Sequence, residues 1–398
     1  MGLFNRKSKS GDDSEETKKE KGAWRRPANT AFKQQRLKAW QPILTPKTVL
    51  PTLFIVGILF APIGALLIWG SSTVSEFSFD YTDCEKQTAS NPPSFTDIPS
   101  SKYNYNLRSS DSKLTVNTPQ WAFFDNSAND TVGPSDKKQC IIEFHVPANI
   151  EPTLFMYYKL TNFFQNHRRY VKSLNSDQLK GKAVSNSTLN DGDCKPLATI
   201  NGKAIYPCGL IANSIFNDTF TDLAMQNPGE GDSEKFAWSD KGIAWPGESK
   251  KYTDNPVHAG GYSYDDIVPP PNWALRYGTS YNETNPPPNL RDDERFQNWM
   301  RTAGLPTFTK LYGRNTADTL KTGTYQITIG LNFPVSTYKG TKSVVFSTVS
   351  WIGGKNAFLG WAYVGAASLF VLLAVAGTAR HLIKPRRLGD LNYLSWNR

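Results

Sequence analysis

The chain of 398 residues carries a formal net charge of +10, and its length allows one large domain with appendages or two ordinary domains. The positive excess lies at the ends: residues 1–47 contain 12 Lys and Arg against 5 Asp and Glu, and residues 380–398 contain 5 against 1, whereas residues 48–379 contain 28 against 29. Because the long middle segment is nearly neutral, this pattern argues against a nucleic-acid-binding groove and fits short flanks facing anionic lipid.

Residues 1–48 are expected to form a cytosolic tail with a distinct segment next to the membrane. Within it, residues 24–46 combine aromatic and basic side chains in a pattern that predicts a short helix. Two interpretations remain open: a helix lying in the cytosolic membrane interface and touching a partner protein, or a plain basic flank of a membrane span. In the first interpretation, the side chains expected to meet the partner include Phe32, Arg36 and Trp40.

The first apolar run, residues 49–70, contains 22 residues and no ionisable side chain. As a helix it would extend roughly 33 Å, enough for a hydrocarbon layer of about 30 Å. Pro62, together with Gly57 and Gly64, predicts either a kink or a close packing face. The run also begins too far into the chain and is too long to be the core of a cleavable signal peptide.

A second apolar run, residues 357–379, is again free of charge, and basic residues follow it at once in the tail 380–398. Basic residues are frequent on the outer flanks of the two runs and sparse on the inner flanks. The positive-inside rule therefore predicts two transmembrane helices with both termini cytosolic. Residues 71–356 would then form a luminal or extracellular ectodomain.

The ectodomain reads mainly as short strands rich in β-branched and aromatic residues, at 139–146, 154–160, 324–333 and 342–351. One helix is expected over 289–303, where three acidic residues would occupy the first turn. The predicted fold class is a membrane protein in which two transmembrane helices carry a large, mainly antiparallel-β, sandwich-like ectodomain with helical excursions.

Cysteines and glycosylation sequons agree with this topology. Four cysteines allow three pairings, and an oxidising lumen favours disulfides over free thiols. Their spacing, without a C-x-x-C pair or a neighbouring His, does not indicate a metal site. The cysteines are Cys84, Cys140, Cys194 and Cys208. The N-x-S/T sequons, expected to carry N-linked glycans, are at Asn129, Asn186, Asn217 and Asn282.

Catalytic motifs are missing from the sequence. It contains no G-x-S-x-G, H-E-x-x-H, Walker loop or G-x-G-x-x-G. The sequence Lys321–Thr324 echoes the D-K-T-G-T phosphorylation motif of P-type pumps, but Leu320 replaces the nucleophilic Asp. We therefore expect no enzyme activity, no catalytic residue and no cofactor other than glycans.

Several blocks of sequence together resemble the ligand-effect-modulator (cell-division-control) family, the β-subunits of type IV P-type ATPases that flip phospholipids. They are distributed along the chain from 25 to 380, and each carries unusual residues in order. The blocks are R-R-P-A-N-T-A-F-K-Q-Q-R-L-K-A-W-Q-P-I-L-T-P (25–46), Y-Y-K-L-T-N-F-F-Q-N-H-R-R-Y-V-K-S (157–173), Y-P-C-G-L-I-A-N-S-I-F-N-D-T-F (206–220), N-W-M-R-T-A-G-L-P-T-F-T-K-L-Y-G (298–313) and S-W-I-G-G-K-N-A-F-L-G (350–360).

The resemblance implies a non-catalytic subunit that forms a heterodimer with the pump, escorts it from the endoplasmic reticulum and supports phospholipid transport to the cytosolic leaflet. It implies the disulfides Cys84–Cys140 and Cys194–Cys208. Small residues of the second span, among them Gly360 and Gly365, would pack against the pump. The expected compartments are the endoplasmic reticulum, the Golgi and endosomal system and the plasma membrane. The alternatives are a two-pass ligand-gated channel subunit and a cell-surface receptor.

Overall fold

The computed structural model describes residues 28–39, 44–226, 228–229, 235–257 and 261–385. The chain divides into two compact units, one formed by Met1–Phe54 with Leu373–Arg398 and the other by Ile55–Leu372. The larger unit contains the ectodomain and the adjoining parts of two long helices.

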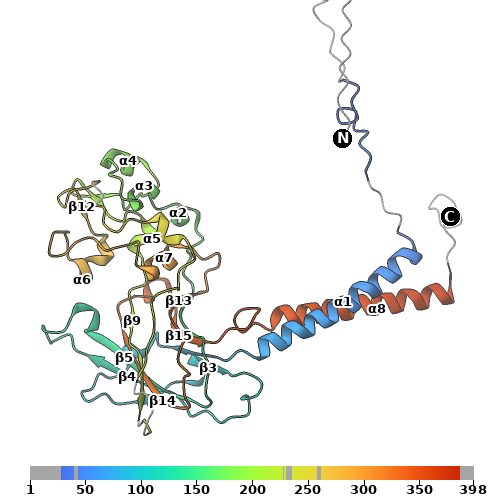
Figure 1. Ribbon diagram of the computed structural model, residues 1–398, viewed down its shortest axis with the longest axis horizontal. Helices are drawn as coiled ribbons and strands as arrows, with labels where there is room; N and C mark the ends of the chain where they lie inside the picture. The colour runs from blue at the N-terminus through green and yellow to red at the C-terminus, as the bar shows by residue number, and fades with distance from the viewer. Residues whose placement is uncertain (1–27, 40–43, 227, 230–234, 258–260, 386–398) are drawn as a thin grey trace, which may run out of the picture. The chain divides into compact units, whose positions relative to one another are not determined.

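The two long helices are α1 (Pro46–Ser72) and α8 (Phe358–Ile383), drawn blue and red in Figure 1. Both are long and apolar enough to cross a membrane, and most of their surface is exposed, unlike that of a core helix. At about 1.5 Å per residue each exceeds the hydrocarbon thickness of about 30 Å. The two expected spans are therefore present as helices, and each helix is slightly longer than its apolar run.

Two antiparallel sheets form the body of the ectodomain (Figure 1). The first has the strand order β13-β6-β15-β1-β3, and the second has the order β11-β10-β14-β5-β4-β2, with β9 also paired to β14. The strands of the first sheet are β1 (Glu76–Asp80), β3 (Tyr103–Asn106), β6 (Leu154–Leu160), β13 (Phe308–Asn315) and β15 (Lys342–Ser347). Those of the second are β2 (Thr96–Asp97), β4 (Gln120–Asp125), β5 (Lys138–Val146), β9 (Thr219–Phe220), β10 (Leu223–Gln226), β11 (Lys235–Phe236) and β14 (Gly323–Gly330).

Side-chain alternation explains why these segments are strands with one face in the core. In β6, every second residue from Leu154 to Leu160 is buried, as the period of two in a strand requires. The inner faces of the two sheets meet through aromatic rings: the Phe144 centroid lies 4.9 Å from that of Phe79 and 5.4 Å from that of Phe346. The sandwich-like fold class is thus confirmed.

Short helices and a small third sheet form the excursions from this sandwich. The third sheet joins β12 to β8 in parallel and β8 to β7 antiparallel. Its strands are β7 (Thr199–Ile200), β8 (Lys203–Ile205) and β12 (Ile267–Val268). The short helices are α2 (Arg168–Val171), α3 (Ser176–Leu179), α4 (Asn186–Asp191), α5 (Leu210–Asn213), α6 (Ala274–Tyr277) and α7 (Glu294–Met300).

Helix α7 is shorter than the predicted helix over 289–303, and side-chain capping explains its start. The Asp293 carboxylate accepts a hydrogen bond from the Phe296 amide at 2.9 Å and so fixes the N-cap. The Asn289 side chain instead accepts the amides of Arg291 and Asp292, which holds this stretch in a turn. Phe296 is fully buried, as expected of the inward face.

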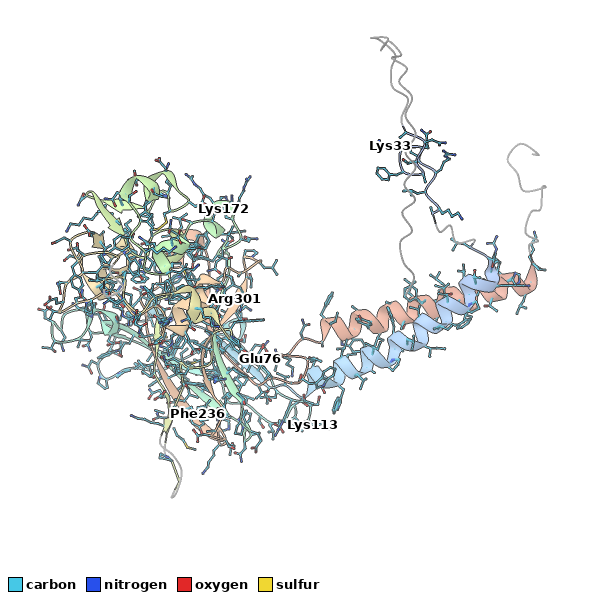
Figure 2. The ribbon with its side chains drawn as sticks, turned by 45° about the horizontal axis from the view of Figure 1, so that its top comes forward. Lys33, Glu76, Lys113, Lys172, Phe236 and Arg301 are labelled. Atoms are coloured by element: carbon cyan, nitrogen blue, oxygen red, sulfur yellow. A yellow bond between two sulfur atoms is a disulfide. The ribbon has the colours of Figure 1, made fainter. Side chains whose placement is uncertain are left out.

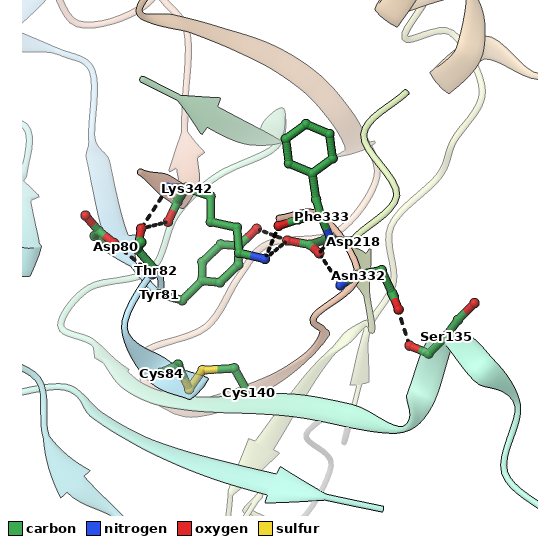
Figure 3. Close-up of polar contacts among 10 residues, drawn as sticks. All are labelled: Asp80, Tyr81, Thr82, Cys84, Ser135, Cys140, Asp218, Asn332, Phe333 and Lys342. Carbon is green, nitrogen blue, oxygen red and sulfur yellow. Dashed lines mark hydrogen bonds and ion pairs between the residues drawn. A yellow bond between two sulfur atoms is a disulfide. The ribbon is translucent and has the colours of Figure 1, made fainter. Parts of the chain in front are cut away.

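Two disulfides cross-link the ectodomain, Cys84–Cys140 and Cys194–Cys208, in the pairing that the resemblance implies. The first connects the segment after β1 with β5, and therefore joins the two sheets (Figure 3). The second closes a loop of the excursion region. Both pairs lie in the buried core.

Candidate functional site

The membrane helices pack directly against each other at glycines. A methyl group added to Gly64 would lie 2.7 Å from Val364 Cγ2 and 2.9 Å from the Gly360 carbonyl oxygen. One added to Gly57 would lie 2.7 Å from Val371 Cγ2. Of the two sequence-based alternatives for these glycines, the structure has the close packing face. Small residues that let backbones approach are a common basis of helix association in lipid.

Two glycines of α8 predicted to meet a partner have different surroundings. Gly360 lies inside the α1–α8 contact, because a Cβ there would be 2.6 Å from Ile68 Cγ1 and 3.0 Å from the Gly64 carbonyl oxygen. Gly360 therefore contacts the chain's own first helix, and its predicted contact with a partner stays a prediction. Gly365 has open space around its Cβ position. An α-helix turns by about 100° per residue, so positions 360 and 365 are about 140° apart around the helix axis. These two glycines therefore lie on different faces of α8.

Residues 28–39 form hydrogen-bonded turns where a short helix was expected (Figure 2, in which Lys33 is labelled). The Arg36 amide donates to the Ala31 carbonyl at 2.7 Å, but Gln35 has a φ of 53°, which interrupts a right-handed helix. The Arg36 side chain donates to Asn29 Oδ1. Phe32 is 76% exposed, and Trp40 lies outside the described residues.

The chain segments next to the membrane helices are tied together by polar contacts. Lys355 Nζ donates to the carbonyl oxygens of Val74 at 2.9 Å and Leu107 at 2.8 Å, and the Asn356 amide donates to Ser71 Oγ at 3.0 Å. Burial lowers the pKa of Lys355, and the nearby Glu76 carboxylate opposes that shift. Exposed tryptophans, typical of a lipid–water boundary, lie close by in sequence: Trp69, Trp351 and Trp361.

The ectodomain contains a buried ion pair (Figure 3). Lys342 Nζ is 2.7 Å from Asp218 Oδ2, and the side chains are 8% and 0% exposed. The Tyr81 hydroxyl donates to the same oxygen at 2.9 Å. The amides of Asn332 and Phe333 both donate to Asp218 Oδ1 at 2.6 Å.

This cluster joins three distant parts of the ectodomain. Tyr81 follows β1, Lys342 begins β15 and Asp218 precedes β9 in the second sheet. Burial, and then the Asp218 carboxylate, raises the pKa of Tyr81 well above its usual value. Both carboxylate oxygens of Asp218 accept hydrogen bonds, so its buried charge is compensated and it links residues of the two sheets.

A second buried lysine, Lys310, caps the C-terminal end of α7. Lys310 Nζ donates to the carbonyl oxygens of Asn298 at 2.8 Å, Trp299 at 3.2 Å and Arg301. These carbonyls are left without partners at the end of a helix, where a cation is favoured. Burial lowers the pKa of Lys310 to about 7, and the Arg301 charge acts in the same direction.

Neither lysine cluster was anticipated from the sequence. Lys342 and Asp218 are 124 positions apart, and the residues next to each in the sequence give no hint of the other. Lys342 comes just before the apolar run Val344–Phe346, and Lys310 lies between Phe308 and Leu311, which is the only sequence signal that either lysine is buried. Within the parts of the chain that the structure describes, no three His, Cys, Asp or Glu gather as metal ligands.

The four sequons all lie in the ectodomain, in different settings. Asn129, Asn186 and Asn282 are exposed, whereas Asn217 is half-buried. The Asn129 side-chain oxygen accepts the Thr131 hydroxyl at 2.7 Å, and that of Asn282 accepts a backbone amide at 2.7 Å. Asn217 Oδ1 is buried and has no hydrogen-bond partner among the described residues.

Comparison with known proteins gives a consistent result. Residues 67–387 match the model of the LEM3 (ligand-effect modulator 3) family / CDC50 family. A relative from Chaetomium thermophilum, named phospholipid-transporting ATPase accessory subunit CDC50, is 40% identical over 94% of this chain and 91% of its own length.

Two further relatives come from yeast and mouse. The accessory subunit CRF1 of a phospholipid-transporting ATPase from Saccharomyces cerevisiae is 41% identical over 94% of this chain and 89% of its own length. Cell cycle control protein 50A from Mus musculus is 38% identical over 88% of each chain. The similarity therefore extends over most of the chain, in fungi and in animals.

Proposed function

This chain belongs to the LEM3/CDC50 family, and from that membership we propose that it is the non-catalytic accessory (β) subunit of a type IV P-type ATPase that moves phospholipids to the cytosolic leaflet. The observation that carries the proposal is the near full-length similarity to chains named accessory subunits of phospholipid-transporting ATPases. In this role the chain helps the catalytic subunit to fold, leave the endoplasmic reticulum and transport lipid.

The proposed topology places both termini in the cytosol and the ectodomain in the lumen or outside the cell. It is supported by the basic tails flanking the two helices. The ectodomain would carry N-linked glycans at the sequons and need no other cofactor. The proposed route runs from the endoplasmic reticulum through the Golgi and endosomal system to the plasma membrane.

The pump would meet this chain in the membrane and on its cytosolic side. Because α1 and α8 use Gly57, Gly64 and Gly360 to pack against each other, the helix face around Gly365 is left for the pump. The exposed Phe32 and the neighbouring Arg36 would contact the pump's cytosolic side. A stable heterodimer would bury more than about 1,000 Å² in total.

Purification of the full chain in mild detergent tests this function. We expect a stoichiometric partner of more than a thousand residues that carries an intact D-K-T-G-T motif, and lipid-stimulated ATP hydrolysis only when that partner is present. Recovery of the chain as a homo-oligomer without such a partner would contradict the proposal and favour a channel subunit. Travel to the cell surface without a pump would favour a receptor.

A further inference from the structure

The ectodomain contains a cavity of about 670 Å³ beside the buried ion pair. Its walls come from the segment before β9, from α6 with the residues preceding it, and from the start of α7. The volume falls in the range of sites that hold a ligand of drug size. The lining residues that matter here are Asn217, Trp273, Leu275, Arg276, Tyr277 and Arg295.

Asn217 is the feature that identifies an occupant. It is the acceptor residue of the sequon Asn217-Asp218-Thr219, and it forms part of the cavity wall. Its Oδ1 atom is buried without a partner, and no hydrogen bond joins its side chain to another described residue. At Asn129 and Asn282, by contrast, the side-chain oxygen is held by its own loop. Because Asn217 lines the cavity, a sugar attached to its Nδ2 would begin at the cavity wall.

The remaining wall has the chemistry that recognises carbohydrate. The rings of Trp273 and Tyr277 lie 5.6 Å apart, and the Arg276 guanidinium is 5.5 Å from the Tyr277 ring. Arg295 stacks on Tyr312, which also lines the cavity, at 3.8 Å. Aromatic faces pack against the apolar faces of sugar rings, and guanidinium groups donate to their hydroxyls.

Leu275 adds an apolar surface that an occupant would cover. It lines the same cavity, although the residue is 58% exposed to solvent. An exposed leucine next to aromatic rings gains stability when another apolar surface covers it. A sugar ring reaching out from Asn217 would provide that surface.

We propose that this cavity is the seat of the N-linked glycan of Asn217, so that the first sugars pack against the protein as part of its fold. The inference rests on the luminal topology of the proposed function. In the modification, Asn217 Nδ2 forms a bond to C1 of the first sugar, and that carbon's bond to the phosphate of a lipid-diphosphate donor breaks. One Nδ2 proton passes to the leaving diphosphate.

Site-resolved deglycosylation of the full-length chain, purified from a eukaryotic host with its partner, tests the seat without any mutation. Peptide N-glycosidase is applied to the folded and to the denatured protein, and glycopeptides are followed by mass spectrometry. We expect release at Asn217 to be at least about tenfold slower than at Asn129 and Asn282 in the folded protein, because a buried linkage must open before the enzyme can reach it. In the denatured protein the rates should be equal. Equal rates in the folded protein would overturn the proposal.

A pair of leucine variants locates the protection. Leu275→Ala removes the apolar wall and should accelerate release at Asn217 several-fold. Leu114→Ala is the matched control, since Leu114 is 44% exposed and does not line the cavity. It should leave the rate unchanged. If Leu275→Ala also left the rate unchanged, the protection would have another origin and the proposed seat would be wrong.

Occupancy separates this inference from the topology on which it rests. An unmodified Asn217 in a chain that carries glycans at Asn129 and Asn282 would overturn the seat and leave the luminal ectodomain standing. A chain that carries no glycan at any of the four sequons would instead contradict the proposed topology itself.

Discussion

Lys342 Nζ lies 2.7 Å from Asp218 Oδ2 at the junction between the two sheets of the ectodomain. Removing one partner leaves the other charge buried and uncompensated, which typically costs about 3–5 kcal/mol. We therefore expect Asp218→Asn, which keeps the sequon at Asn217 intact, to lower the free energy of unfolding by roughly that amount. Thermal unfolding of the purified full-length chain measures the effect.

The matched control for this variant is an exposed pair. Lys182 and Asp177 are 3.0 Å apart, with side chains 69% and 59% exposed. Surface pairs of this kind contribute little because solvent screens them. Asp177→Asn should leave the melting temperature unchanged. Equal effects of Asp218→Asn and Asp177→Asn would show that the buried cluster does not hold the sheets together.

The lowered pKa of Lys310 predicts that the free energy of unfolding increases with pH. Its pKa in the fold is lowered from 10.5 to about 7 by burial, so the unfolded chain binds the proton more tightly between these values. The free energy of unfolding should therefore increase as the pH rises through this window. The three carbonyl oxygens that accept from the protonated amine act against the shift and narrow this pH window.

The variant Lys310→Met isolates this titration. It lacks the proton-binding group and leaves carbonyls at the end of α7 unsatisfied, at a cost of about 2 kcal/mol. Denaturant unfolding of both proteins at several pH values should show their difference growing from about pH 7 to about pH 10. Parallel curves would mean that the carbonyls cancel the effect of burial.

The glycine contacts of the membrane helices predict opposite outcomes for two similar substitutions. Gly64→Leu forces a side chain into the Gly360 backbone, and overpacking typically costs about 1–3 kcal/mol. Gly365→Leu places the same side chain in open space and should leave the stability of the isolated chain unchanged. If the pump packs on the Gly365 face, this second variant should lose co-purification of the pump. Wild-type stability of Gly64→Leu would contradict the observed helix contact.

The N-terminal segment gives a functional prediction. Deleting residues 1–45 removes Phe32 and Arg36 and leaves the ectodomain and both long helices complete, because α1 begins at Pro46. We expect the truncated chain to fold with an unchanged melting temperature but to support less lipid transport in reconstituted vesicles. The Phe32→Ala variant of the full chain is the milder comparison. Unchanged complex formation and transport after the deletion would show that the segment is only a flank of the span.

Local patterns made much of the fold predictable. The alternation in 154–160 and the charge-free runs 49–70 and 357–379 are properties of neighbouring residues, and the structure has β6, α1 and α8 there. The C-terminal end of α7 was less predictable, because it is capped by Lys310, ten residues beyond Met300. The rotation of α8, which turns Gly360 toward α1, depends on tertiary packing. The partner of Asp218 lies 124 positions away, beyond any periodic signal.

Strands β1 and β15 are direct neighbours, with Glu76 opposite Ser347 in the register. The folded part between the two helices therefore starts and finishes about 5 Å apart, one strand spacing. A polypeptide with that arrangement is suited to excision: a water-soluble module cut at these two positions would keep every sheet pairing and both cross-links. A bridge of a few glycines and serines across the cut would even allow new termini to be opened in a surface loop elsewhere.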